Sequence, residues 1–305
     1  MTTMGGMNSR SSETDAAQAI GFQRPRSLWW DAARRFSRNR LSMVASVFVV
    51  GLILMAVFAN VLAPEGYDNQ DYSQTWQFPS LEHPMGTDPF GRELLTRVIH
   101  GARISLGVGF ISSFVALVIG MPFGAVAAWY GGTTDYVLMR IVEIVNSVPN
   151  LLLGILIMSV LGAGLENVLF VFFVTGWMEI ARLLRGQMLS LREQDFVLAA
   201  RCIGVSDFRI IARHLLPNTL APIIVSVTLG IPGAILGEAG LSFLGVGVNP
   251  PMPSWGRMLY DYLSAVQSHW YLAFFPGLMI AVSMFAFTLV GDGLQDALDP
   301  TQAGR

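Results

Sequence analysis

The polar stretch Ser190-Leu-Arg-Glu-Gln-Asp-Phe-Val-Leu-Ala-Ala-Arg-Cys-Ile-Gly204 lies between two apolar segments, and the rest of the chain is organised around it. Ser190 and Glu193 have the spacing of a capping box, which predicts the start of a helix. Gly204 suits the left-handed residue that follows a helix end. Ser206 can cap a second helix, which we expect to stop before Pro217. The stretch is therefore predicted to form two short helices joined by a glycine turn.

The composition is typical of a membrane protein that crosses the bilayer several times. Of its 305 residues, 53% are hydrophobic and 13% are charged, and the mean hydropathy is +0.53. All 19 basic residues are arginine, so the chain lacks the P-loop lysine and cannot itself be a P-loop ATPase. Its single cysteine, Cys202, cannot form an internal disulfide. The net charge of -2 gives no indication of nucleic-acid binding.

Apolar segments of about membrane length recur along the chain and predict an all-α membrane protein with six transmembrane helices. They are residues 41–62, 104–129, 136–161, 165–180, 219–240 and 270–290. Pro149 interrupts the third segment, and the fourth is short. The span at 104–129 is rich in Gly and Ser, which permits close helix packing. The Gly and Pro residues of the span at 219–240 suit a flexible span.

Composition also divides the chain into four regions. Residues 1–26 are polar and without periodicity, which predicts a disordered cytoplasmic tail. Residues 27–103 hold a helix with Trp29, Trp30 and clustered arginines at the membrane interface, then the first span and an outer loop. Residues 104–291 form the core and include the loop at 190–218, and residues 292–305 form a cytoplasmic C-terminal tail.

The arginines predict the orientation. If the N-terminus is cytoplasmic, fourteen arginines fall in cytoplasmic segments and four in outer ones, with Arg140 at an edge. This bias follows the positive-inside rule, so we expect both termini and the 190–218 loop to face the cytoplasm.

Part of the loop resembles a known motif. Ala199-Ala200-x3-Gly204, nine residues and then His214-Leu-Leu-Pro217 is similar to the EAA loop of ABC-importer permeases, although Leu198 stands where that motif has Glu. The resemblance implies coupling helices that sit in a cleft on a separate ATPase. The residues that it implies for this contact are Ala199, Ala200, Gly204, Leu216 and Pro217. The alternative is an amphipathic hairpin that lies idle on the membrane surface.

Three further segments resemble the C-type permease subunit of the dipeptide, oligopeptide and nickel branch of that family. They are His83-Pro-Met-Gly-Thr-Asp-Pro-Phe-Gly-Arg-Glu93 and the segments 238–256 and 291–300. The resemblance places two outer loops, at Gly86, Thr87 and Asp88 and at Asn249, Pro250 and Pro251, against an extracytoplasmic binding protein. A metal site at His83, Asp88 and Glu93 is the less favoured interpretation, because a lone histidine among scattered carboxylates is more often structural.

Few charged residues fall in or near the spans. Arg140 and Glu143 are three residues apart on one predicted helix face and are expected to pair, with a role in the substrate path as the less favoured alternative. Glu179 and Arg182, at the end of the fourth span, are interpreted in the same way, with the same alternative. Glu238 near the end of the fifth span is expected either to line the translocation path, with Pro232 and Gly233, or to make loop hydrogen bonds.

The resemblance implies a type I ABC importer permease that is not itself an enzyme. Its expected partners are a second related permease, two ATPase subunits that bind ATP and Mg, an extracytoplasmic binding protein and the lipid bilayer of a bacterial cytoplasmic membrane. The substrate would be a di- or oligopeptide, or alternatively nickel or another small solute. An ion-coupled secondary transporter predicts inverted repeats and a midplane ionisable group, and an intramembrane hydrolase predicts a catalytic cluster; neither pattern is found.

Overall fold

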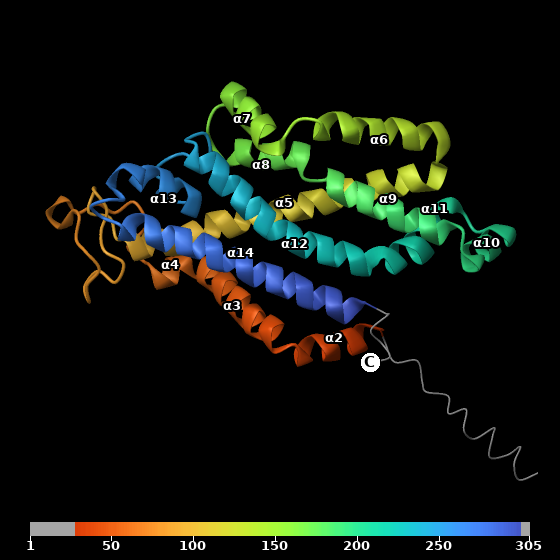
Figure 1. Ribbon diagram of the computed structural model, residues 1–305, viewed down its shortest axis with the longest axis horizontal. Coiled ribbons are helices and arrows are strands. Elements are labelled where there is room, and N and C mark those ends of the chain that lie inside the picture. The colour runs from red at the N-terminus through yellow and green to blue at the C-terminus, as the bar shows by residue number, and fades with distance from the viewer. Residues whose placement is uncertain (1–27, 300–305) are drawn as a thin grey trace, which may run out of the picture.

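The computed structural model describes residues 28–299, and in this range the chain is an elongated bundle of helices (Figure 1). The predicted disordered tail at 1–26 lies outside the described residues. The helices before the polar loop are α2 (Leu28–Arg38), α3 (Arg40–Val57), α4 (Ala59–Leu62), α5 (Leu94–Tyr130), α6 (Gly132–Asn146), α7 (Asn150–Leu161), α8 (Leu165–Thr175) and α9 (Met178–Arg192). Those from the loop onward are α10 (Asp195–Cys202), α11 (Asp207–Ile210), α12 (Leu216–Phe243), α13 (Trp255–Tyr262) and α14 (Tyr271–Leu298).

The predicted six-span architecture is confirmed within the described residues. Five helical segments are long and apolar enough to cross a membrane: Arg40–Val57, Leu94–Tyr130, Leu165–Arg192, Asp207–Phe243 and Tyr271–Leu298. The pair α6 and α7 makes a sixth when counted together, and it is bent by 78°. The bend falls at Pro149, because the residue before a proline disfavours the helical conformation.

The bundle has two different ends (Figure 1). At one end lie α4, α13 and the long connection between α4 and α5; we name it the α13 end. At the other end α10 and α11 project beyond the bundle; we name it the α10 end. Helix α5 runs the length of the bundle and begins at Leu94, ten residues before the predicted start at 104, so its first turns belong to the α13 end.

Helices α5 and α9 approach closely because glycines lie between them. A Cβ atom added to Gly124 would lie 2.4 Å from the backbone oxygen of Ala181, and one added to Gly120 would lie 2.7 Å from that of Trp177. The two glycines are four residues apart and share one face of α5, in the small-xxx-small pattern of close helix pairs in membranes. This contact fixes α9, and with it the start of the polar loop, to the centre of the bundle.

Helix α2 lies beside α14 at the α10 end (Figure 1). It buries Ala32 and exposes Trp30, Arg34 and Arg38, which agrees with the predicted interfacial helix. Helix α14 continues through the first part of the predicted C-terminal tail to Leu298, and residues 300–305 are outside the described range.

Candidate functional site

The first loop helix begins later than predicted. Ser190 lies inside α9, and Glu193 is the residue at its C-terminal end, so the predicted capping box is wrong. The physical reason is burial: Leu184 and Met188 are fully buried in the core, and their packing extends α9 past the local start signal. The loop helix α10 starts instead at Asp195.

The predicted glycine turn after α10 is confirmed. Gly204 has a φ of +77°, in the left-handed region that favours glycine. Its N–H donates to the carbonyl of Arg201 at 3.0 Å, and the N–H of Val205 donates to the carbonyl of Ala200 at 3.1 Å. These two bonds form a Schellman motif, which satisfies carbonyls that the helix end leaves open.

The second loop helix does not stop before Pro217. Ser206 precedes α11, without a side-chain capping bond, and the chain then passes through a π turn at Ile211–Leu215 into α12. In this turn the N–H of Leu216 donates to the carbonyl of Ile211, five residues back. Pro217 follows in the first turn of α12, where its missing N–H is tolerated. The loop is therefore joined to the fifth span by unbroken helical structure.

Apolar side chains project from the loop. Ile203 and Phe208 are each 80% exposed, and Leu198 and Phe196 are also exposed. Of the predicted contact residues, Ala199 and Pro217 are exposed, whereas Ala200 is only 7% exposed and packs on its own core. The surface offered to a partner thus includes Ala199, Ile203 and Phe208 but not Ala200. Phe208 was not among the contact residues predicted from the sequence, although a large apolar residue in a short polar segment could have indicated it.

Two arginines join the loop to the end of α5. The guanidinium of Arg201 on α10 lies 4.3 Å from the centre of the Trp129 ring. Arg192, at the end of α9, donates from Nη1 to the carbonyls of Ala128 at 2.9 Å and Trp129 at 3.3 Å. A displacement of α10 therefore acts directly on the last turn of α5.

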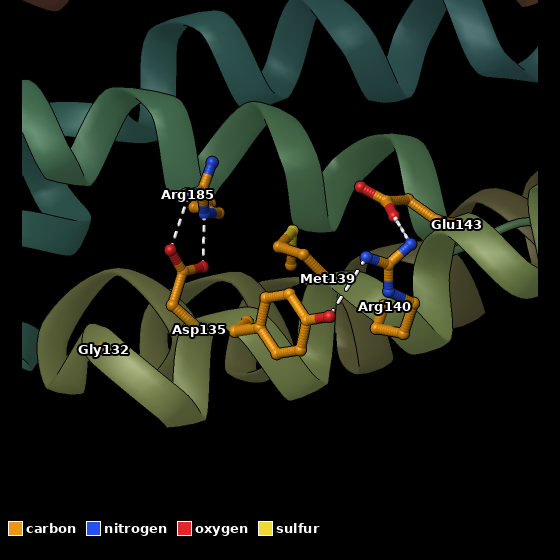
Figure 2. Close-up of a pocket in the computed structure, with 7 residues that line it drawn as sticks. Gly132, Asp135, Met139, Arg140, Glu143 and Arg185 are labelled. Atoms are coloured by element: carbon orange, nitrogen blue, oxygen red, sulfur yellow. Dashed lines mark hydrogen bonds and ion pairs between the residues drawn. The ribbon is translucent and has the colours of Figure 1, made fainter.

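Helix α6 is tied to α9 at the same end (Figure 2). Both oxygens of Asp135 accept hydrogen bonds from Arg185 at 2.5 Å. The predicted pair of Arg140 and Glu143 is confirmed at 2.9 Å, and Arg140 also donates to the Tyr136 hydroxyl at 3.2 Å. Because the Arg140–Glu143 pair is exposed, its contribution to stability is small.

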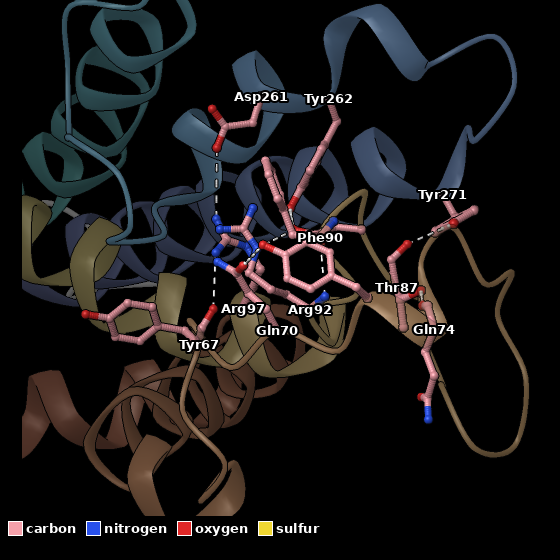
Figure 3. A network of polar contacts seen from close by, with 12 residues as sticks. Tyr67, Gln70, Gln74, Thr87, Phe90, Arg92, Arg97, Asp261, Tyr262 and Tyr271 are labelled. Atoms are coloured by element: carbon pink, nitrogen blue, oxygen red, sulfur yellow. Dashed lines mark hydrogen bonds and ion pairs between the residues drawn. The ribbon is translucent and has the colours of Figure 1, made fainter.

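The α13 end has a buried polar network (Figure 3). Asp88 is fully buried; its Oδ2 is 2.6 Å from Nε of Arg92 and accepts a hydrogen bond from the Tyr262 hydroxyl at 2.9 Å. Its Oδ1 accepts from the backbone N–H groups of Phe90 and Arg92. Burial, above all, raises the pKa of Tyr262, so its phenol stays protonated and donates to the carboxylate.

Arg97 extends this network to the α4–α5 connection. Its Nη1 donates to the carbonyl of Tyr67 at 3.2 Å, and its Nη2 is 3.9 Å from Asp261 of α13 (Figure 3). Asp261 also accepts from Arg257 at 2.8 Å. The network therefore links the start of α5, the connection before it and α13 into one unit.

Comparison with known proteins decides the family. Residues 120–303, which are more than half of the chain, match the family described as binding-protein-dependent transport system inner membrane component. Residues 27–84 match the N-terminal transmembrane domain of oligopeptide transport permease C.

The chain belongs to the binding-protein-dependent transport system inner membrane components. It is similar to the dipeptide transport system permease protein DppC of Bacillus subtilis, with 44% identity over 88% of this chain and 85% of that protein. The oligopeptide permease OppC of the same organism is 42% identical over 90% of each chain. The glutathione permease GsiD of Escherichia coli is 40% identical over 97% of this chain and 98% of that one.

A solved structure supports the fold of this membrane component. An inward-facing form of the MetNI methionine ABC transporter covers 68% of this chain and 98% of its own, with a TM-score of 0.58 and 19% identity. At this identity the likeness concerns the fold alone. The permease fold expected from the sequence is therefore confirmed.

The permease component buries half of its predicted binding-protein contacts. Thr87 and Asp88 are buried, and Gly86 (φ +81°) leaves no room for a side chain, because a Cβ would lie 2.5 Å from the carbonyl of Gln77. These residues shape the outer loop, and their side chains are not available to a partner in this conformation. Asn249, Pro250 and Pro251 are exposed.

His83 and Glu93 contact each other rather than Asp88. The Nδ1 atom of His83 is 2.6 Å from Oε2 of Glu93. Asp88 is occupied by Arg92 and Tyr262, so the three residues weighed as a metal site are not brought together around one point. No group of three metal-ligating side chains occurs among residues 28–299.

Glu238 makes loop hydrogen bonds, the second of the two roles expected for it. It is fully buried and accepts from the hydroxyls of Ser242 and Ser254 at 2.7 Å and of Ser105 at 3.2 Å. These serines belong to α12, the start of α13 and α5. Pro232 is also buried and Gly233 is exposed. Glu238 therefore joins three elements at the α13 end.

Proposed function

We propose that this chain is the permease subunit of an ATP-driven ABC importer for di- or oligopeptides. The observation that carries the proposal is the projecting loop, in which a Schellman turn separates α10 from α11 and unbroken helix joins α11 to a membrane span. The similarity to dipeptide, oligopeptide and glutathione permeases favours a peptide as substrate.

The proposal assigns the two ends to the two sides of a bacterial cytoplasmic membrane. The α10 end faces the cytoplasm, in agreement with the arginine bias, and there meets ATPase subunits that bind ATP and Mg. The α13 end faces outward, where Asn249, Pro250 and Pro251 contact the binding protein. A second, related permease completes the translocation path.

Alternating access then depends on how the loop is attached. Closure of the ATPase pair moves α10, whose Arg201 lies on Trp129 of α5, and moves α12 through the π turn. Glycine contacts make α5 and α9 move together. The network around Asp88 keeps the outer loop and α13 as one body during this motion. Transport thus proceeds by tilting of packed spans relative to one another.

The proposal is tested by purifying the chain from cells that also produce its cognate ATPases, permease and binding protein. We expect the ATPases to co-purify, and cells without other peptide importers to take up a labelled dipeptide. Uptake should stop when ATP is depleted and persist when only the ion gradient is collapsed. Uptake that follows the ion gradient would contradict the proposal in favour of a secondary transporter, and uptake of labelled nickel but not of dipeptide would refute the substrate.

A further inference from the structure

A cavity of about 1070 Å³ opens among α2, α9, α12 and α14. It is distinct from the buried surroundings of Glu238, the residue that the sequence suggested for the path. Ligand sites in proteins typically measure about 300–1,000 Å³, so this cavity has room for a short peptide. Half of the residues that line it are apolar, among them Leu183, Val225 and Leu229, and the other half are polar or charged.

The charged residues of the cavity lie at two depths. The span Leu165–Arg192 continues past its predicted end at 180, so Glu179 lies half-way along it, where the sequence analysis had found no ionisable group. Arg182 is one turn nearer the α10 end. Asp31 and Arg35 of α2, together with Asp299 after α14, line the cavity at the α10 end of the bundle. Arg35 is already engaged there, because its Nη1 donates to the carbonyl of Asp299 at 3.1 Å. The cavity therefore extends from the middle of the bundle toward the α10 end.

Glu179 and Arg182 are the unusual pair. They are three residues apart on α9, a spacing at which Cβ atoms lie about 5–6 Å from each other. The sequence predicted that they pair, but between residues 28 and 299 neither side chain has a hydrogen-bond or ion-pair partner. Both are exposed to the cavity instead. Ionisable groups within spans are costly, and those that face a cavity typically mark a substrate or ion pathway.

We propose that this cavity binds a short peptide in its zwitterionic form. Glu179 receives the N-terminal ammonium group and Arg182 the C-terminal carboxylate, for which a planar guanidinium is well suited. The apolar part of the wall accepts peptide side chains without selecting among them, so the site recognises the two charged termini of the peptide. This inference rests on the proposed function and adds to it a binding site within this subunit.

Another zwitterion has the same chemistry, namely the headgroup of phosphatidylethanolamine. A lipid would enter from the bilayer and a peptide from the translocation path. The test therefore compares vesicles that contain phosphatidylethanolamine with vesicles made of phosphatidylcholine and phosphatidylglycerol alone.

The experiment measures protection of a cysteine placed in the cavity wall. Ser226 lines the cavity, so Ser226→Cys in a Cys202→Ser background provides one reporter thiol. The complete transporter is reconstituted, and a membrane-impermeant maleimide is added on the side of the α10 end. We expect labelling, and slower labelling in the presence of Ala-Phe but not of the N-acetylated, C-amidated dipeptide, in both kinds of vesicle.

Two variants test whether Glu179 and Arg182 are responsible for the protection by Ala-Phe. Glu179→Gln and Arg182→Gln should each raise the half-protective concentration of Ala-Phe by about tenfold, because each loses a charge-assisted hydrogen bond. The same substitutions at the exposed pair Arg140 and Glu143, Arg140→Gln and Glu143→Gln, are matched controls and should leave protection unchanged.

Several results would overturn the inference. They are equal protection by the blocked dipeptide, unchanged protection in both cavity variants, no labelling from the α10 side, or a labelling rate that depends on phosphatidylethanolamine and not on Ala-Phe. The same preparation is assayed for ATP-driven uptake. If uptake is normal while protection fails, the inference is wrong and the proposed function stands; if uptake itself does not depend on ATP, the proposed function fails.

Discussion

The two ends of this permease are built in opposite ways. At the α13 end, buried polar and charged side chains bond one another around Asp88, although Nε of Arg97 has no hydrogen-bond partner among the described residues. At the α10 end, apolar side chains such as Ile203 and Phe208 are exposed, and the projecting loop is attached through Arg192, Arg201 and continuous helix. The first arrangement makes a rigid unit of the loops outside the bundle. The second leaves apolar surface that a partner subunit can cover.

The comparison predicts that substitutions at the α13 end act mainly on stability. Asp88→Ala should have the largest effect, a loss of about 3–5 kcal/mol in the free energy of unfolding, because it leaves the buried Arg92 without its partner. Denaturant titration of the purified chain in detergent measures this loss. Asp71→Ala in the same outer region is the control, because the exposed side chain of Asp71 bonds only its neighbour Ser73 among the described residues, and the substitution should change little. Equal stability of the two variants would contradict the account.

Tyr262→Phe should have the next largest effect, about 1.5–3 kcal/mol, because the buried carboxylate of Asp88 loses a donor. It should also change the response to alkali. Burial raises the pKa of Tyr262 above its ordinary value of 10.0, so above that pH the unfolded chain releases the proton while the folded chain keeps it. The stability of the wild type should therefore fall as the pH rises beyond 10, whereas this contribution should be missing in Tyr262→Phe. If the free energy of unfolding falls equally with pH in both proteins, the Tyr262 hydroxyl is not a buried donor.

Gly124→Ala tests the centre of the bundle, between the two ends. We expect a loss of about 1–3 kcal/mol, since the added Cβ meets the backbone of Ala181, which cannot rotate away. Gly107→Ala, in the same helix but with open space around its Cβ position, is the matched control and should be neutral or slightly stabilising. If both variants behave alike in thermal unfolding, α5 and α9 are not held in close contact.

Gly204→Ala should have the smallest effect on stability. The Cβ position is open, so the cost is only that of the left-handed backbone, about 1–2 kcal/mol. Gly186→Ala in α9, also in open space but without a positive φ, is the control. We expect Gly204→Ala to weaken ATPase association more than its cost in stability would suggest, because the turn sets the direction of α11. Unchanged association in a pull-down would show that the turn does not position the contact.

The sequence predicted the spans and the glycine turn because both depend on local signals: long apolar runs, and a glycine after a helix. It misplaced the start of α10, because the burial of Leu184 and Met188 outweighs the capping signal at Ser190. It also expected the helix after the turn to stop before Pro217, since the π turn that leads into that proline has no sequence signal.

Long-range contacts explain the remaining differences. Nothing near Asp88 in the sequence shows that Tyr262, 174 residues away, covers it. Likewise, Glu238 is joined to Ser105 across 133 residues, so its role in binding loops together was only one of two open alternatives. Glu179 and Arg182 have the spacing of an ion pair, but among the described residues they form none and both line the cavity beside α9.

The central claim is that the exposed apolar surface at the α10 end is where the ATPase docks. Its most direct test is a double substitution, Ile203→Asp and Phe208→Asp, measured by co-purification of the ATPase with the membrane-inserted chain. Leu81→Asp, a fully exposed leucine at the α13 end, is the matched control. We expect normal membrane levels of all variants and no change in ATPase retention for Leu81→Asp. The double variant should retain the ATPase at least about tenfold more weakly, because two apolar side chains are no longer buried in the contact. Wild-type retention by the double variant would contradict the claim.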